Sequence, residues 1–160
     1  MRMMKVDPWV LKVVLFLAPL CPICQNMSYD LRQLEEEFAD APVEFVGVFP
    51  NASTQVEQIE AFRVEYGLSM QMKQDTDGWT EALNAHWTPE AFVLDVNDSI
   101  LYQGRINDRY FAPGRRRNKT RNRDLREAIA SSLRGAAVAV PRTDAVGCPI
   151  EGMPVLSPKQ

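Results

Sequence analysis

The sequence predicts a single α/β domain, and three observations support this fold class. An uninterrupted apolar run over 13–18 has the length and composition of a buried strand. Strand-like runs over 43–49 and 91–94 follow it, and helical patterns separate the three. A chain of 160 residues suits one domain, since a chain of roughly 150 residues buries about 70% of its unfolded surface. Strands that alternate with helices are typical of a sheet covered by helices.

Composition narrows the possible functions. With 46% hydrophobic and 24% charged residues, the chain resembles an ordinary soluble globular protein. A net charge of −3 gives no general reason to expect nucleic acid as a partner. No stretch reaches the roughly 20 apolar residues of a membrane span. The sequence therefore predicts no nucleic-acid binding and no membrane span.

The N-terminus allows two interpretations. A basic start over 1–5 ahead of an apolar stretch is compatible with a secretory signal. Asp7, Pro8 and Lys12 interrupt the apolar segment that such a signal needs, so we expect a strand here instead. The compartment stays open: cytoplasmic, or periplasmic if a leader is missing from this chain.

The remaining elements follow in order from periodicity and turn residues. We expect helices over 26–39, 54–66, 79–86 and 124–133, a strand over 43–49, and a hairpin formed by 91–94 and 100–102. A capping box formed by Thr54 and Glu57 is expected to start the second helix, with Val56 on its inner face. Residues 107–123 are predicted to be a loop. We expect residues 1–135 to form the domain and the aperiodic tail, 136–160, to pack on it.

Two cysteines lie where the first strand meets its helix, in Cys21-Pro22-Ile23-Cys24. Unpaired backbone N–H groups and the positive end of the helix dipole would favour a thiolate at Cys21. Cys24 lies one turn later on the same face and can close a disulfide with it. This spacing also serves zinc sites, but those usually need a second close Cys/His pair, and the remaining candidates, His86 and Cys148, stand alone.

The order of elements, the CxxC sequence and the segment Trp87-Thr88-Pro89-Glu90-Ala91-Phe92-Val93-Leu94-Asp95 together resemble one known group. The chain is similar over about 10–134 to the redoxin branch of the thioredoxin-like superfamily, which includes AhpC/TSA-like and TlpA/ResA-like thiol-disulfide oxidoreductases. The resemblance implies a thioredoxin-like fold with a central mixed β-sheet flanked by helices. It also implies an enzyme that exchanges a dithiol and a disulfide with partner proteins.

The resemblance assigns roles to particular residues. Cys21 would be the more exposed, attacking cysteine, and Cys24 would resolve the mixed disulfide, leaving Cys21–Cys24 oxidised. Pro89 would follow a cis peptide bond, and Thr88 would present backbone polar groups to a partner. Leu20 and Trp87 would line the partner-binding groove. The mechanism needs no organic cofactor and no metal.

Departures from the family pattern leave alternatives open. Peroxiredoxins carry Thr three residues before the reactive cysteine, where this chain has Ala18, which disfavours a peroxide reductase. A second alternative is a module that binds Cu or Zn through Cys21 and Cys24 together with His86 or Cys148. Metal analysis of reduced protein would separate this alternative from an oxidoreductase.

Two features fall outside the CxxC motif. Cys148 is an odd third cysteine, and it allows three interpretations: a free structural thiol, a third redox cysteine, or a metal ligand. The run 115–123 carries six positive charges in nine residues. It is either a solvated loop or a docking site for an acidic redox partner at Arg115, Arg116 and Arg117.

Overall fold

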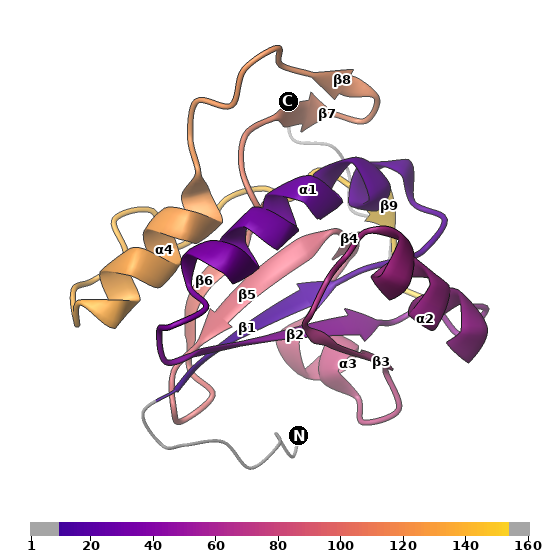
Figure 1. The fold of residues 1–160 in the computed structure, drawn as a ribbon, viewed down its shortest axis with the longest axis horizontal. Coiled ribbons are helices and arrows are strands. Elements are labelled where there is room, and N and C mark those ends of the chain that lie inside the picture. The colour runs from indigo at the N-terminus through magenta and orange to yellow at the C-terminus, as the bar shows by residue number, and fades with distance from the viewer. Residues whose placement is uncertain (1–9, 154–160) are drawn as a thin grey trace.

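The computed structural model describes residues 10–153. The basic start over 1–5 and the last seven tail residues lie outside this range, so the signal interpretation is not tested by it. A twisted sheet forms the centre of the molecule, and helices lie on both of its faces (Figure 1). Within the described range, no helix combines the length and the apolar character needed to span a membrane.

The central sheet is mixed, as the sequence predicts. Its strands follow the order β3-β2-β1-β5-β6. The bounds are Leu11–Phe16 for β1, Val43–Phe49 for β2, Gln71–Gln74 for β3, Glu90–Leu94 for β5 and Ile100–Gly104 for β6. Strands β1, β2 and β3 run parallel, whereas β5 is antiparallel to both β1 and β6.

Within residues 10–153, four helices cover the sheet. Their bounds are Pro22–Glu37 for α1, Val56–Glu65 for α2, Trp79–Leu83 for α3 and Asp124–Leu133 for α4. Side chains of α1, α2 and α4 pack in one core cluster with Val13 and Leu15 of β1. Side chains of α3 pack in a second cluster with Val14 and Phe16. Strand β1 is therefore buried on both faces, which explains why its sequence is continuously apolar.

The start of α2 differs from the sequence prediction. Its N-cap is Gln55, whose N–H donates to Oε1 of Gln58 at 2.8 Å, so the capping pair lies one residue beyond the predicted one. Thr54 is buried instead, and its carbonyl accepts a bond from Nε2 of Gln74 at 2.9 Å. Val56 is 65% exposed, so its predicted place on the inner face was wrong. Packing against β3 decides the position of Thr54, and local capping signals do not contain that information.

The segment predicted as a loop contains a short hairpin. Strands β7 (Tyr110–Ala112) and β8 (Arg115–Arg116) pair antiparallel outside the main sheet. Nδ2 of Asn26 in α1 donates to the hydroxyl of Tyr110 at 2.8 Å, which fixes the hairpin against the first turns of α1. These strands have too few residues for a period-2 pattern to predict them.

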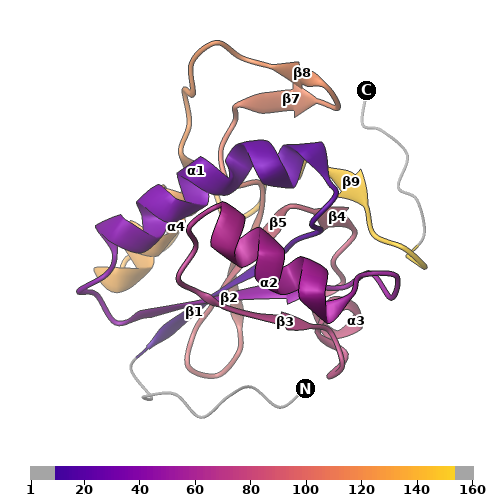
Figure 2. The ribbon, with the colours of Figure 1, turned by 45° about the vertical axis from the view of Figure 1, so that its right-hand side comes forward.

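The described part of the tail folds back across the domain. Residues 141–151, which we call the strap, first lie along β6, where N–H of Gln103 donates to O of Pro141 and N–H of Thr143 donates to O of Gln103, both at 3.0 Å. Strand β9 (Cys148–Pro149) then pairs antiparallel with β4 (Trp87–Thr88). Figure 2 shows β9 beside β4, close to the start of α1. The tail thus reaches the end of the domain that carries the cysteines.

Candidate functional site: a three-cysteine thiol centre

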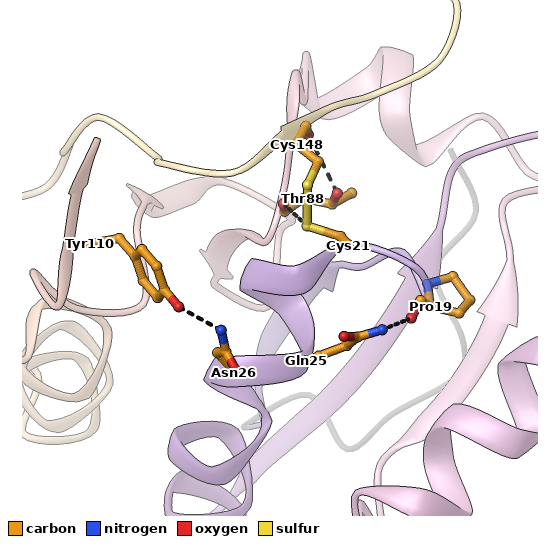
Figure 3. The surroundings of a disulfide bond; sticks show 7 residues. All are labelled: Pro19, Cys21, Gln25, Asn26, Thr88, Tyr110 and Cys148. Atoms are coloured by element: carbon orange, nitrogen blue, oxygen red, sulfur yellow. Dashed lines mark hydrogen bonds between the residues drawn. A yellow bond between two sulfur atoms is a disulfide. The ribbon is translucent and has the colours of Figure 1, made fainter. Parts of the chain in front are cut away.

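The cysteine centre begins at the N-terminus of α1. Cys21 is the N-cap residue, with φ −77° and ψ 116°, and Pro22 occupies the first turn, four residues before the predicted start of the helix. Nε2 of Gln25 donates to O of Pro19 at 2.8 Å and holds the preceding loop in place (Figure 3). The first turn of α1 contains no acidic residue, so no carboxylate there offsets the positive end of the helix dipole.

The disulfide in the structure differs from the predicted one. Cys21 is bonded to Cys148, 127 residues away in sequence, and their Cα atoms lie 6.1 Å apart. Cys24 is free and buried. The disulfide that the sequence suggested, Cys21–Cys24, is therefore not the one present, and Cys148 is not a free thiol. Sequence spacing favours the nearer cysteine, whereas the folded strap brings a distant one to the same sulfur.

Thr88 contacts both cysteines of the disulfide and is completely buried. Its carbonyl oxygen lies 3.2 Å from Sγ of Cys21. Its backbone pairs with that of Cys148 in the β4–β9 ladder, and its Oγ1 donates to the carbonyl of Cys148 at 3.4 Å. Its side chain also acts on Cys24, whose pKa it lowers. The Thr88–Pro89 peptide bond is cis. Figure 3 shows Thr88 beside the disulfide, between the strap and α1.

Gly147 allows the strap to approach this loop closely. A Cβ placed on Gly147 would overlap the carbonyl oxygen of Thr88 and would lie 2.7 Å from its carbonyl carbon and 3.1 Å from N of Pro89. Because the atoms it would meet are backbone, no side chain can move aside to make room. Any other residue at this position would push the strap away from Thr88.

Cys24 is a thiol at neutral pH. Complete burial raises the pKa of Cys24 from 9.0 to about 12, although hydrogen bonds from the backbone of Ala18 and the side chain of Thr88 act in the opposite direction. A thiolate there would be almost unsolvated. Cys24 can therefore react only after a change in its surroundings or after transfer of its proton.

The other residues predicted to form the site lie around the disulfide. Leu20 is 77% exposed beside Cys21, and Trp87 is half-buried with its backbone paired to Pro149. Pro89 is buried. Cys21 itself is only 4% exposed, so the expectation of an exposed attacking cysteine does not hold in this disulfide form. The strap covers the sulfur that the sequence predicts to be accessible.

The candidate metal ligands named from the sequence do not lie together in this structure. Among residues 10–153, no group of three or more His, Cys, Asp or Glu side chains is arranged to hold a metal ion. The sulfurs of Cys21 and Cys148 are bonded to each other. Nε2 of His86 lies 3.2 Å from Oδ1 of Asn84. The side chains of the predicted Cu or Zn module therefore do not converge in this form.

The basic run begins on the hairpin next to α1. Arg115 and Arg116 are exposed on β8. The guanidinium groups of Arg115 and Arg117 lie over the ring of Phe111, 5.4 and 5.3 Å from its centroid, and Nε of Arg117 also donates to O of Asp108 at 3.1 Å. The guanidinium groups of Arg115 and Arg117 are therefore held against the hairpin.

A known protein family matches the part of the chain that contains the sheet and the first two cysteines. Residues 10–103 match the family model described as AhpC/TSA family. This chain belongs to the AhpC/TSA family. The matched segment contains β1, the Cys21 and Cys24 pair and the Thr88–Pro89 bond, whereas the strap lies beyond it. No curated protein matches the chain in a sequence search.

Solved structures agree on the fold of this AhpC/TSA protein. A hypothetical protein from Sinorhizobium meliloti is 23% identical, with a TM-score of 0.76 over 88% of this chain and 79% of its own. An uncharacterized conserved protein from Geobacillus kaustophilus is 22% identical, with a TM-score of 0.76 over 92% of this chain and 79% of its own. A thiol:disulfide interchange protein from Chlorobium tepidum is 18% identical, with a TM-score of 0.58 over 78% of this chain and 80% of its own. These similarities establish a thioredoxin-like fold.

Sequence reasoning missed the residues that hold the strap. Oγ1 of Thr143 accepts N–H of Arg105 at 2.9 Å and lies 2.6 Å from the hydroxyl of Tyr102. A Cβ on Gly104, whose φ is +147°, would lie 2.5 Å from the carbonyl oxygen of Thr143. The sequence signals, a glycine before the odd cysteine and a glycine ending a strand, are individually too common to be diagnostic.

Proposed function

We propose that this protein is a thiol-disulfide oxidoreductase in which Cys21 exchanges disulfides with cysteines of partner proteins. One observation carries the proposal: Sγ of Cys21 is bonded to a cysteine of an extended segment whose backbone pairs with Thr88. An incoming partner cysteine needs the same arrangement. Membership of the AhpC/TSA family supports thiol-based redox chemistry of this kind.

In the reducing direction, the Cys21 thiolate attacks one sulfur of a partner disulfide. The partner S–S bond breaks, a Cys21–partner mixed disulfide forms, and the second partner sulfur leaves as a thiolate that takes up a proton. A second cysteine of this chain then gives up its proton and attacks Sγ of Cys21. The partner is released as a dithiol, and two electrons have passed to it from two cysteines of this chain.

Either Cys24 or Cys148 can perform the second step. Cys148 is supported by the disulfide in the structure, and Cys24 by its position one helical turn after Cys21. Attack of Cys24 on the Cys21–Cys148 bond would form Cys21–Cys24 and release Cys148, so the two disulfides interconvert without an external oxidant. Thr88, Leu20 and Trp87 would contact the partner segment.

The basic hairpin supplies a candidate docking surface for an acidic redox partner. Its root is hydrogen-bonded to Asn26, in the second turn of the helix that Cys21 begins. An acidic partner held by Arg115 and Arg116 would therefore lie on the end of the domain that carries the disulfide. Such a surface speeds encounter chiefly at low ionic strength.

Three single variants test the proposal in full-length protein: Cys21→Ser, Cys24→Ser and Cys148→Ser. The rate of reaction of the reduced protein with a small aromatic disulfide is measured near neutral pH. We expect Cys21→Ser to react more slowly. Cys21→Ser combined with Cys148→Ser should react at least about 100-fold more slowly than Cys148→Ser alone, because the remaining thiol, Cys24, is buried, has a raised pKa and contributes little thiolate. The other two variants should keep the first, attacking step. Unchanged reactivity in Cys21→Ser would overturn the assignment of the attacking sulfur.

A further inference from the structure

We propose that the strap is an internal substrate. In this proposal, residues 147–150 occupy the polypeptide-binding site of Cys21 and show which sequences it accepts. The site takes an extended segment with glycine immediately before the reacting cysteine and an apolar residue two positions after it. This inference rests on the proposed function, since it names the substrate class of the same site.

The pairing between strap and site has a defined register. Cys148 lies opposite Thr88 and Pro149 opposite Trp87, and N–H of Ile150 donates to O of His86 at 3.0 Å. Three consecutive residues of the strap therefore pair with the segment that leads into Pro89. Main-chain pairing of this kind gives affinity for any extended segment. The choice among partner sequences therefore depends on the space that the site leaves for each side chain of the segment.

Glycine is required before the cysteine because of the close approach to Thr88. The atoms that a Cβ at position 147 would meet are the carbonyl oxygen and carbon of Thr88 and N of Pro89, all of them backbone. Those atoms belong to the site, and any partner segment in the same register meets them. A partner with a larger residue at this position must shift away from Thr88, and its sulfur then moves away from Sγ of Cys21.

An apolar residue is favoured two positions after the cysteine. Ile150 is 3% exposed and belongs to the core cluster that contains Trp79 and Leu83 of α3. Burying such an apolar side chain stabilises the paired segment, whereas a charged side chain would lose its hydration there. Pro149, between the two selected positions, is exposed, so the site does not select a side chain at that place.

The strap is held in a way that allows replacement once its disulfide is reduced. Beyond the paired residues, the contacts of its last part are polar and exposed: N–H of Glu151 donates to Oδ1 of Asn51 at 2.9 Å, and its carboxylate accepts from Ser53. Exposed polar contacts contribute little free energy. A partner segment with the same pattern can therefore compete with the strap for Thr88.

The test uses full-length Cys24→Ser/Cys148→Ser protein, in which Cys21 is the only cysteine. Three peptides spanning residues 145–152 are compared: the natural sequence, one with Val in place of Gly147, and one with Asp in place of Ile150. Each peptide cysteine is activated as a mixed disulfide with 2-nitro-5-thiobenzoate. The Cys21 thiolate attacks the peptide sulfur and releases the coloured thiolate, and mass spectrometry verifies the peptide adduct.

We expect the natural peptide to react at least about tenfold faster than each altered peptide, while all three react equally with free glutathione. Equal rates with the protein would overturn the selectivity and leave the proposed function standing. Lack of reaction with every peptide, and also with a small aromatic disulfide, would overturn both.

A second measurement tests the same selection inside the chain. Gly147→Val is made in a Cys24→Ser background, and the equilibrium of the Cys21–Cys148 disulfide against glutathione is compared with that of Ala139→Val, an exposed tail position. We expect the effective concentration of Cys148 toward Cys21 to fall at least tenfold in the Gly147→Val variant and to stay unchanged in the Ala139→Val variant. Equal values in the two variants would overturn the requirement for glycine.

Discussion

Cys148 pairs with Thr88 through its backbone while its sulfur is bonded to Cys21. The β4–β9 ladder therefore aligns a cysteine from the end of the chain with one near its beginning. Because the side chain of Thr88 also lowers the pKa of Cys24, a single buried residue acts on all three cysteines. Which pair forms a disulfide thus depends on whether the strap lies on Thr88.

Removing Cys148 should change which disulfide forms. We expect oxidised Cys148→Ser protein to contain Cys21–Cys24, because Cys24 is then the remaining cysteine of the chain. The matched Cys24→Ser variant should keep Cys21–Cys148. Peptide mapping by mass spectrometry after mild oxidation distinguishes the two. Two free thiols in oxidised Cys148→Ser protein would show that Cys24 cannot reach Cys21.

Cys24 should resist alkylation in the folded protein. Its pKa of about 12 leaves roughly one thiolate in 10⁴ at pH 8, about a thousandfold less than an ordinary cysteine of pKa 9.0. In the Cys21→Ser/Cys148→Ser background, iodoacetamide should label it at least a hundredfold more slowly in buffer than in denaturant. Comparable labelling rates would show that the buried environment does not persist in solution.

The same pKa predicts a loss of stability at high pH. The folded protein keeps the Cys24 proton up to about pH 12, whereas the unfolded chain releases it near pH 9.0. The contribution of the Cys24 thiol to the free energy of unfolding is therefore complete below pH 9.0 and is lost as pH rises toward 12. Relative to a Cys24→Ala control, the free energy of unfolding should fall by roughly 1.6 kcal/mol between pH 9 and 10.5. Urea denaturation of the fully reduced proteins measures this difference. A constant difference between the two proteins would contradict the shift.

Thr143→Val should loosen the strap. Val keeps the branched shape but loses the hydroxyl that accepts N–H of Arg105 and contacts Tyr102, and this costs about 1–3 kcal/mol. We expect a lower free energy of unfolding and, in the Cys24→Ser background, a weaker Cys21–Cys148 disulfide against glutathione. Thr143→Ser keeps the hydroxyl and should behave almost as wild type. If Thr143→Val lowers stability but leaves the disulfide equilibrium unchanged, this residue does not anchor the strap.

Charge reversal on the hairpin tests the partner surface. In Arg115→Glu/Arg116→Glu protein, the reaction with a peptide disulfide flanked by Glu should be roughly three- to tenfold slower at low salt. The reaction of the same variant with a Lys-flanked peptide disulfide should be faster. Arg63→Glu/Arg134→Glu carries the same change in net charge away from the hairpin, in α2 and at the C-cap of α4, and serves as the control. Both effects should shrink at high salt. Identical rates in all proteins at low salt would remove the docking role.

Much of the domain can be predicted because its signals are local. Burial of β1 on both faces requires a continuous apolar run, and Pro22 after Cys21 marks the start of α1. The extent of α4 follows from the same kind of pattern, whereas the mixed sheet was implied by the resemblance to the thioredoxin-like superfamily. The start of α2 could not be predicted, because Thr54 is buried through a contact with Gln74, and such a contact leaves no periodic trace.

The sequence by itself determined that two cysteines begin a helix after a buried strand, because apolar runs, prolines and helix starts depend on residues that are adjacent in the sequence. Tertiary structure alone decided that Cys148 is the disulfide partner of Cys21. Gly147 and Thr143 make that pairing possible through contacts with Thr88 and Gly104, which lie about 40 to 60 positions earlier in the chain. Contacts between such distant segments depend on how the whole chain packs, and no local pattern specifies them.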